Sequence, residues 1–112
     1  VNQNKTFCMP CSADSIESSQ GQEDHVSMGA NAATKAYIII NNVEKILAIE
    51  LLNAAQAFEF RRPLKSSAFI EELFESYRQH VPFVEDDTVM YKLMHASRDF
   101  IQGLEIDIPD EL

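Results

Sequence analysis

The stretch that decides the fold is IIINNVEKILAIELLNAAQAFEF, residues 38–60, which would be apolar on almost every face of a helix. Its polar side chains give only a narrow stripe, which Ile49 interrupts: Asn42, Lys45, Asn53 and Gln56. A helix that is apolar all round lies either in a large protein core or in lipid. The charges of Glu44, Lys45 and Glu50 argue against lipid. We therefore expect a helix that other protein surfaces cover on all sides.

The helix that carries this stretch is predicted to run from about Asp24 to Arg61. Good helix formers fill it, and it contains no proline. Asp24 or Ser27 can accept hydrogen bonds from the free N–H groups of its first turn. Arg61 lies where the helix dipole is negative, and Pro63 ends the helix. The prediction is one helix that is too long and too apolar for the rest of a 112-residue chain to cover.

Two shorter amphipathic helices are predicted to follow. The first covers residues 67–80, where apolar side chains recur at helical spacing. The second covers residues 88–102, with Asp87 or Thr88 as its N-cap and Gly103 as the residue that stops it. We predict an all-α chain with one long central helix and two shorter ones. Each apolar side chain left exposed would forgo roughly 1.5–3 kcal/mol, so the chain should self-associate or belong to a larger assembly.

The chain is long enough for one domain at most. Residues 1–23 are polar and have no sustained period, so we interpret them as an irregular loop. Residues 24–103 form the helical segment. Residues 104–112 form an acidic tail that either docks as a short extended arm or stays disordered. The chain starts at Val1 without an initiator methionine, which we interpret as a cut in a longer protein, although removal of a tag could also produce it.

The charge balance excludes some classes of partner. The net charge of −9 argues against nucleic acid and anionic membrane surfaces, because both require clustered Lys and Arg. No uncharged apolar run is long enough to span a bilayer. No signal peptide is visible and only two cysteines are present, so the cytoplasm is the expected location.

A metal or redox site is also disfavoured. Cys8-Met9-Pro10-Cys11 is a CxxC motif, but the chain has no second cysteine pair to complete a zinc site. His25, His80 and His95 lie far apart in the sequence, without acidic or cysteine ligands at metal-binding spacing. We therefore predict no metal and interpret His25 as a structural histidine.

The segment Gln22-Glu23-Asp24-His25-Val26-Ser27-Met28-Gly29 resembles the late signature of the histidine ammonia-lyases, within the aromatic amino acid lyase family. The flanks agree with it. Residues 12–16 resemble the loop that leads into the signature, residues 43–56 resemble the long helix that follows, and residues 64–67 and 80–83 continue the match. The sequence departs from the family at Glu17, where Pro is frequent, and at Gly21, where Asn is frequent, which leaves the path of the loop open.

The resemblance implies a mainly helical, tetrameric enzyme that eliminates ammonia from histidine to give urocanate. Its electrophile is a methylidene-imidazolone, formed from an Ala-Ser-Gly triplet that this chain lacks. The family's enzymes are several times longer than this chain. The resemblance therefore implies that the chain is the C-terminal part of a larger helical-bundle lyase, that the long helix packs in the tetramer core, and that the chain alone is inactive.

Glu23 matches the family's active-site glutamate, and we predict for it both a catalytic and a substrate-binding role. A carboxylate can accept the N–H of an imidazole, and it can also take a proton. Relatives that act on phenylalanine or tyrosine commonly have Gln at this position, so Glu23 favours histidine. We predict that Gln22 helps to bind the substrate, and we interpret Asp24 as a helix cap. Two alternatives stay open: a related tyrosine or phenylalanine ammonia-lyase or aminomutase, and a non-catalytic helical self-association module in which Glu23 only stabilises a helix end.

Overall fold

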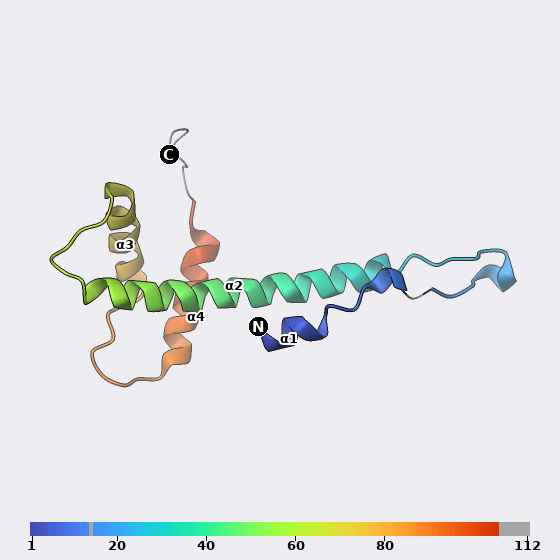
Figure 1. The fold of residues 1–112 in the computed structure, drawn as a ribbon, viewed down its shortest axis with the longest axis horizontal. Helices are drawn as coiled ribbons and strands as arrows, with labels where there is room; N and C mark the ends of the chain where they lie inside the picture. The colour runs from blue at the N-terminus through green and yellow to red at the C-terminus, as the bar shows by residue number, and fades with distance from the viewer. Residues whose placement is uncertain (14, 106–112) are drawn as a thin grey trace. The chain divides into compact units, whose positions relative to one another are not determined.

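The computed structural model describes residues 1–13 and 15–105, and the regular elements within them are helices. In chain order they are α1 (Asn2–Thr6), the 3-10 turns η1 (Cys11–Ala13) and η2 (Ser19–Gly21), α2 (Gly29–Glu59), α3 (Ala68–His80) and α4 (Met90–Gly103) (Figure 1). The all-α prediction of one long and two shorter helices is confirmed. The chain divides into two compact units, Val1–Val43 and Glu44–Leu112, with the boundary inside α2. The predicted tail falls outside the described residues from position 106 onward.

The first unit contains α1, both 3-10 turns and the N-terminal part of α2. The Asn42 side-chain amide donates to Gln3 Oε1 and Asn4 Oδ1, both at 2.8 Å, and so attaches α1 to α2. Lys35 Nζ donates to the Met9 carbonyl. The expectation of an irregular segment over residues 1–23 missed α1, which is stabilised by these contacts with α2.

The predicted start of the long helix was wrong. α2 begins at Gly29, because the residues before it use their backbone in other hydrogen bonds. Glu23 N–H donates to the Ser18 carbonyl, and Val26 N–H donates to Ser15 Oγ. Asp24 is therefore too far from the helix to cap it, and the interpretation of Asp24 as a cap was wrong.

The second unit has its core where α3 and α4 pack against the C-terminal part of α2 (Figure 1). The buried side chains of this core come from all three helices and the residue after α3: Ala48, Leu52, Ala55, Tyr77, Val81, Ser97 and Phe100. α3 begins close to the predicted residue, and Ser67 caps it by accepting a hydrogen bond from Ile70 N–H at 3.4 Å.

The ends of α4 differ from the prediction. The N-cap position is Val89, which makes no side-chain cap, so Asp87 and Thr88 do not have that role. Met90, the first helical residue, packs against the buried core, and we attribute the start of the helix to this apolar contact. Gly103 is the last helical residue and does not follow the helix end. The chain leaves the helix at Leu104, which is extended and also packs against the core.

A buried chain of hydrogen bonds joins the three helices of this unit. The Tyr77 hydroxyl donates to Ser97 Oγ at 3.0 Å, and the Ser97 hydroxyl donates to the Ala48 carbonyl at 2.8 Å. Tyr77 and Ser97 are 1% and 0% exposed. Burial raises the pKa of the Tyr77 phenol, because a phenolate would lose its hydration there. The chain of bonds therefore satisfies polar groups that water cannot reach.

Two arginines pack among aromatic rings near the end of α2. Arg78 donates to the Val81 carbonyl at 3.1 Å and to the Ala55 carbonyl at 2.8 Å, and its guanidinium lies 5.0 Å from the Phe74 ring centroid. Arg62 Nη1 lies 2.7 Å from Glu71 Oε2. The backbone N–H of residue 66 and the Arg62 guanidinium lower the pKa of the Glu71 carboxyl.

Large apolar side chains remain exposed along α2, as its all-round apolar character predicted. They include Ile40, Val43, Leu47 and Ile49, at 58%, 41%, 47% and 38% exposed. Within the described residues, no helix combines the length and the apolar character needed to cross a bilayer.

Candidate functional site

The predicted site residues lie in the loop that joins η1 to α2, within the first unit. Ser18 N–H donates to the Glu23 carbonyl at 3.1 Å, and Glu23 N–H donates to the Ser18 carbonyl at 3.3 Å. Between them Ser19, Gln20 and Gly21 turn the chain with φ values of 53°, 57° and 81°. The loop is thus a narrow hairpin, with Glu23 at the point where its two arms first pair.

The backbone N–H and carbonyl of Glu23 are both hydrogen-bonded to Ser18, and the Glu23 side chain is exposed. Among the residues that the structure describes, none makes a hydrogen bond or ion pair with the Glu23 carboxylate. A carboxylate with both oxygens free can accept N–H donors from a ligand. The hairpin therefore holds the backbone of Glu23 in place and leaves its acceptor atoms available.

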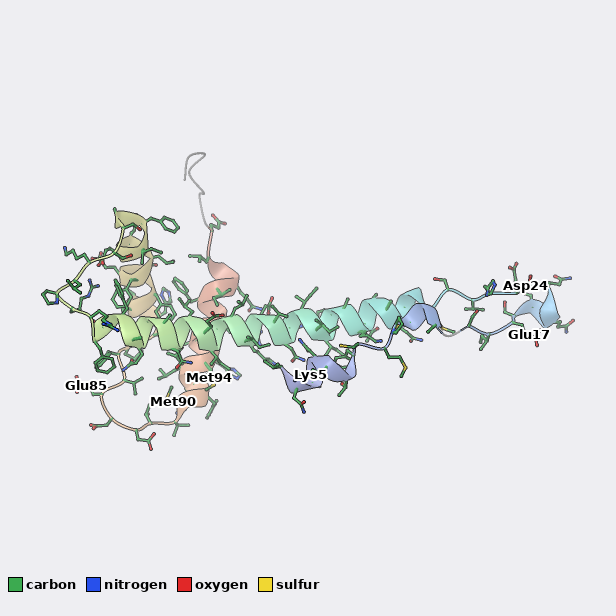
Figure 2. All side chains as sticks on the ribbon, viewed as in Figure 1. Lys5, Glu17, Asp24, Glu85, Met90 and Met94 are labelled. Atoms are coloured by element: carbon green, nitrogen blue, oxygen red, sulfur yellow. The ribbon has the colours of Figure 1, made fainter. Side chains whose placement is uncertain are left out.

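The neighbours of Glu23 lie on the same exposed loop. Gln22 N–H donates to the Ser19 carbonyl at 3.3 Å, and the Gln22 and Asp24 side chains are exposed. Figure 2 shows Glu17 and Asp24 together at the outer end of the loop. Gln22 and Glu23 lie next to each other on this loop, and the roles assigned to them stay predictions.

An open hollow of about 570 Å³ lies where the loop meets α2. His25 lines it together with residues from both arms of the loop and from the start of α2, among them Cys11, Ser15, Val26 and Met28. Cys8 and Cys11 are free thiols. Within residues 1–13 and 15–105, no group of His, Cys, Asp and Glu side chains is arranged to hold a metal ion.

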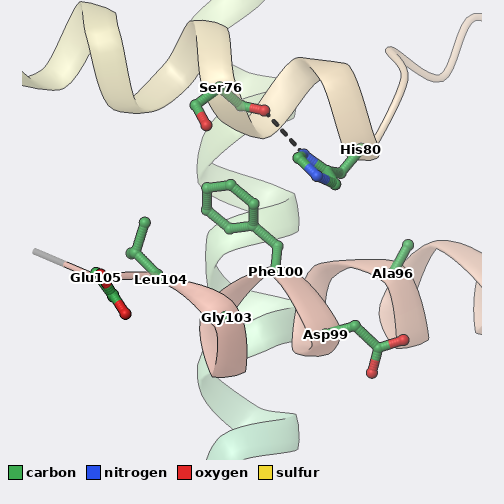
Figure 3. A pocket seen from close by; sticks show the side chains of 8 residues that line it. All are labelled: Ser76, His80, Ala96, Asp99, Phe100, Gly103, Leu104 and Glu105. Atoms are coloured by element: carbon green, nitrogen blue, oxygen red, sulfur yellow. Dashed lines mark hydrogen bonds between the residues drawn. The ribbon is translucent and has the colours of Figure 1, made fainter.

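A second hollow, of about 440 Å³, lies between α3 and α4 in the other unit (Figure 3). His80 Nδ1 lies 3.1 Å from the Ser76 carbonyl, one turn earlier on α3, and the His80 ring centroid lies 5.4 Å from that of Phe100. The imidazole is thus held by its own helix and by an aromatic ring.

The sequence missed the residues that shape the hairpin. Ser15 Oγ accepts a hydrogen bond from Val26 N–H at 3.1 Å, which links the two arms near the base of the loop. The composition of residues 15–21, rich in Ser and ending in Gly, is typical of turns. That signal indicates a turn but not which residues pair across it.

Comparison with known proteins places this loop and the helices in a family. The profile of the aromatic amino acid lyase family matches residues 1–79. A histidine ammonia-lyase from Anaeromyxobacter sp. (strain K) is 44% identical over 108 residues, covering 95% of this chain and 21% of that protein. One from Caenorhabditis elegans is 42% identical over 102 residues, covering 91% of this chain and 15% of that protein.

A solved structure agrees with these sequence matches. The crystal structure of histidine ammonia-lyase from Trypanosoma cruzi superposes with a TM-score of 0.87 at 40% identity, covering 91% of this chain and 20% of that one. The chain spans about a fifth of the length of the first relatives that it matches. Since the family profile covers more than half of its residues, this chain belongs to the aromatic amino acid lyase family.

Proposed function

We propose that this chain forms the C-terminal part of a histidine ammonia-lyase, which converts histidine to urocanate and ammonia. The observation that carries the proposal is the Glu23 carboxylate, free of partners within the described residues on a hairpin whose backbone is already paired. The family membership and the similarity to proteins named histidine ammonia-lyase support the choice of reaction.

Glu23 has the chemistry that an imidazole substrate needs. Its oxygens accept the ring N–H, and the same carboxylate can take a proton. Gln22, the residue before it, can offer an amide donor and acceptor to the same substrate. Both groups bind and orient the substrate in this proposal.

The 112 residues do not contain the triplet from which the electrophile of the reaction forms. The family's methylidene-imidazolone forms from an Ala-Ser-Gly triplet, and no such triplet occurs in the 112 residues. We therefore expect the chain alone to be inactive, with the electrophile supplied from outside it.

The exposed apolar side chains of α2 support an oligomer, and we propose a homotetramer in which α2 packs against neighbouring helices. Ile40 and Leu47 are 58% and 47% exposed, and leaving them in water forgoes burial energy. Sedimentation of the chain should show association, and Leu47→Glu should weaken it because a carboxylate is costly to bury. A wild-type chain that sediments as a monomer would contradict the proposal. The cytoplasmic location stays a prediction.

The test of the activity is a grafted enzyme, in which this chain replaces the matching segment of a histidine ammonia-lyase relative. Urocanate formation is followed by its ultraviolet absorbance. Glu23→Gln keeps the size of the side chain but replaces a carboxylate with an amide, so turnover of histidine should fall roughly a hundredfold or more. Glu72→Gln is the matched control, because Glu72 is an exposed glutamate on α3, outside the hairpin.

The same assay separates the alternatives. A grafted enzyme that prefers tyrosine or phenylalanine over histidine would replace the proposed substrate. If the Glu23→Gln variant were fully active, the result would favour the alternative in which this segment is a non-catalytic helical association module. Equal losses in Glu23→Gln and Glu72→Gln would show a general effect of charge and would also contradict the proposal.

A further inference from the structure

The direction of the Glu23 side chain depends on the loop between η1 and α2 that carries it. Only two links between its arms occur among the described residues. One is the backbone pair between Ser18 and Glu23, with hydrogen bonds of 3.1 and 3.3 Å. The other is the bond from Val26 N–H to Ser15 Oγ, at 3.1 Å. The second link is the one made by a side chain, so it can be removed by substitution.

The tip of the loop is costly to form. Ser19 and Gln20 both have a positive φ, a conformation that residues with a Cβ adopt rarely and with strain. A two-stranded hairpin by itself is marginally stable in water. A tip with this backbone therefore needs support from another part of the loop to stay populated.

Ser15 is placed to give that support. It precedes the Ser18–Glu23 pair by three residues on one arm, and Val26 follows the pair by three residues on the other. Both residues also line the hollow at the start of α2, so the link lies where the loop meets the helix. Closing the base of a loop restricts the freedom of everything beyond it.

We propose that Ser15 is a positioning residue for Glu23: its hydroxyl oxygen fixes Val26 across the base of the hairpin and so fixes the direction of the carboxylate. Ser15 acts through the backbone and has no contact with the substrate. The inference rests on the proposed function of Glu23.

The experiment uses the grafted enzyme with Ser15→Ala, Ser15→Thr and the control Ser66→Ala. Ser66 is an exposed serine before α3, and its side chain makes no hydrogen bond within the described residues. Ser15→Ala removes the acceptor and should lower kcat/KM for histidine roughly tenfold, which corresponds to about 1.4 kcal/mol. Ser15→Thr retains a hydroxyl and should keep at least half of the activity, and Ser66→Ala should match the parent.

A double variant distinguishes positioning from a general loss of structure. If Ser15 acts by directing the Glu23 carboxylate, adding Ser15→Ala to Glu23→Gln should lower kcat/KM less than twofold further, because the group being directed is already gone. An undiminished tenfold loss in the Glu23→Gln background would overturn the inference. So would full activity of Ser15→Ala while Glu23→Gln is inactive. A Glu23→Gln variant with the full activity of the parent would instead overturn the proposed function.

Amide hydrogen exchange of the 112-residue chain gives a reading that does not depend on activity. Ser15→Ala should speed exchange of the Val26 N–H, which loses its acceptor, and of the Glu23 N–H, which depends on the closed loop. Ser15→Thr should leave both slow. Unchanged exchange of both amides in Ser15→Ala would count against the proposal whatever the kinetics show.

Discussion

Replacing Ser97 with alanine should be among the more damaging single substitutions in the chain, although it removes one oxygen atom. The Ser97 hydroxyl accepts from Tyr77 at 3.0 Å and donates to the Ala48 carbonyl at 2.8 Å, and its residue is 0% exposed. The substitution leaves the Tyr77 hydroxyl buried without a partner, which costs about 1–3 kcal/mol, and removes a second hydrogen bond worth about 1 kcal/mol. We expect the free energy of unfolding to fall by about 2–4 kcal/mol.

Tyr77→Phe provides the matched comparison. It removes the donor but leaves the bond from Ser97 to Ala48 intact, so it should cost only about 1 kcal/mol. The double variant no longer contains the stranded hydroxyl. It should therefore be less destabilised than the sum of the two single variants, and no worse than Ser97→Ala alone.

The measurement is urea unfolding of the 112-residue chain, followed by far-ultraviolet circular dichroism. All variants are compared at one protein concentration, because association would shift the transition. Strictly additive losses, or a loss below about 0.5 kcal/mol for Ser97→Ala, would refute the argument from a stranded buried hydroxyl.

Three further substitutions test other parts of the structure. The pKa of the Glu71 carboxyl is lowered in the fold, so its contribution to stability is present above its unfolded pKa and is lost as pH falls through its folded pKa. Glu71→Gln should therefore lower the melting temperature at neutral pH. In acid, the variant and the parent should melt at the same temperature. Gly21→Asn should leave exchange of the Glu23 amide slow, whereas Gly21→Val should speed it severalfold, because a φ of 81° strains a β-branched residue far more than asparagine. Arg78→Lys should lower the free energy of unfolding by about 2 kcal/mol, because lysine cannot reach both the Ala55 and Val81 carbonyls; exposed Arg61→Lys is its control, and equal losses in the two would contradict this account.

Helices whose boundaries depend on residues close in sequence could be predicted from the sequence alone. The helix predicted over residues 67–80 is α3, and Ser67 caps it, because a serine hydroxyl before an amphipathic run accepts a bond from the first turn. The all-round apolar pattern of residues 38–60 correctly indicated side chains that the rest of the chain does not cover. Leu47 and Ile40 show this, since both remain largely exposed.

Elements that depend on distant contacts could not be predicted in the same way. The short helix α1 has no apolar period, and the Asn42 side chain attaches it to α2 from almost forty residues away. The start of α2 was misplaced for a similar reason. Asp24 and Ser27 have capping chemistry, but the backbone N–H groups of Glu23 and Val26 are bonded to Ser18 and Ser15, and the helix begins only at Gly29.

The candidate site was predicted in part. Glu23 and Gln22 were singled out from the resemblance of the sequence, not from a pattern of spacing, and their roles stay predictions. The pairing across the hairpin was not foreseen, because it depends on backbone atoms that every residue possesses. Gly21, a departure from the asparagine frequent in the family, lies at φ 81°, where glycine and asparagine are the best tolerated residues.

The backbone pairing of Ser18 with Glu23 has a consequence for how such a loop can evolve. Its two hydrogen bonds join main-chain atoms and so do not depend on which side chain follows the Cα of residue 23. Selection could exchange that side chain, for example glutamate for glutamine, while the path of the chain is inherited unchanged. Under the proposed function, the chemical group that position 23 offers to a substrate can therefore change while the main-chain scaffold stays the same.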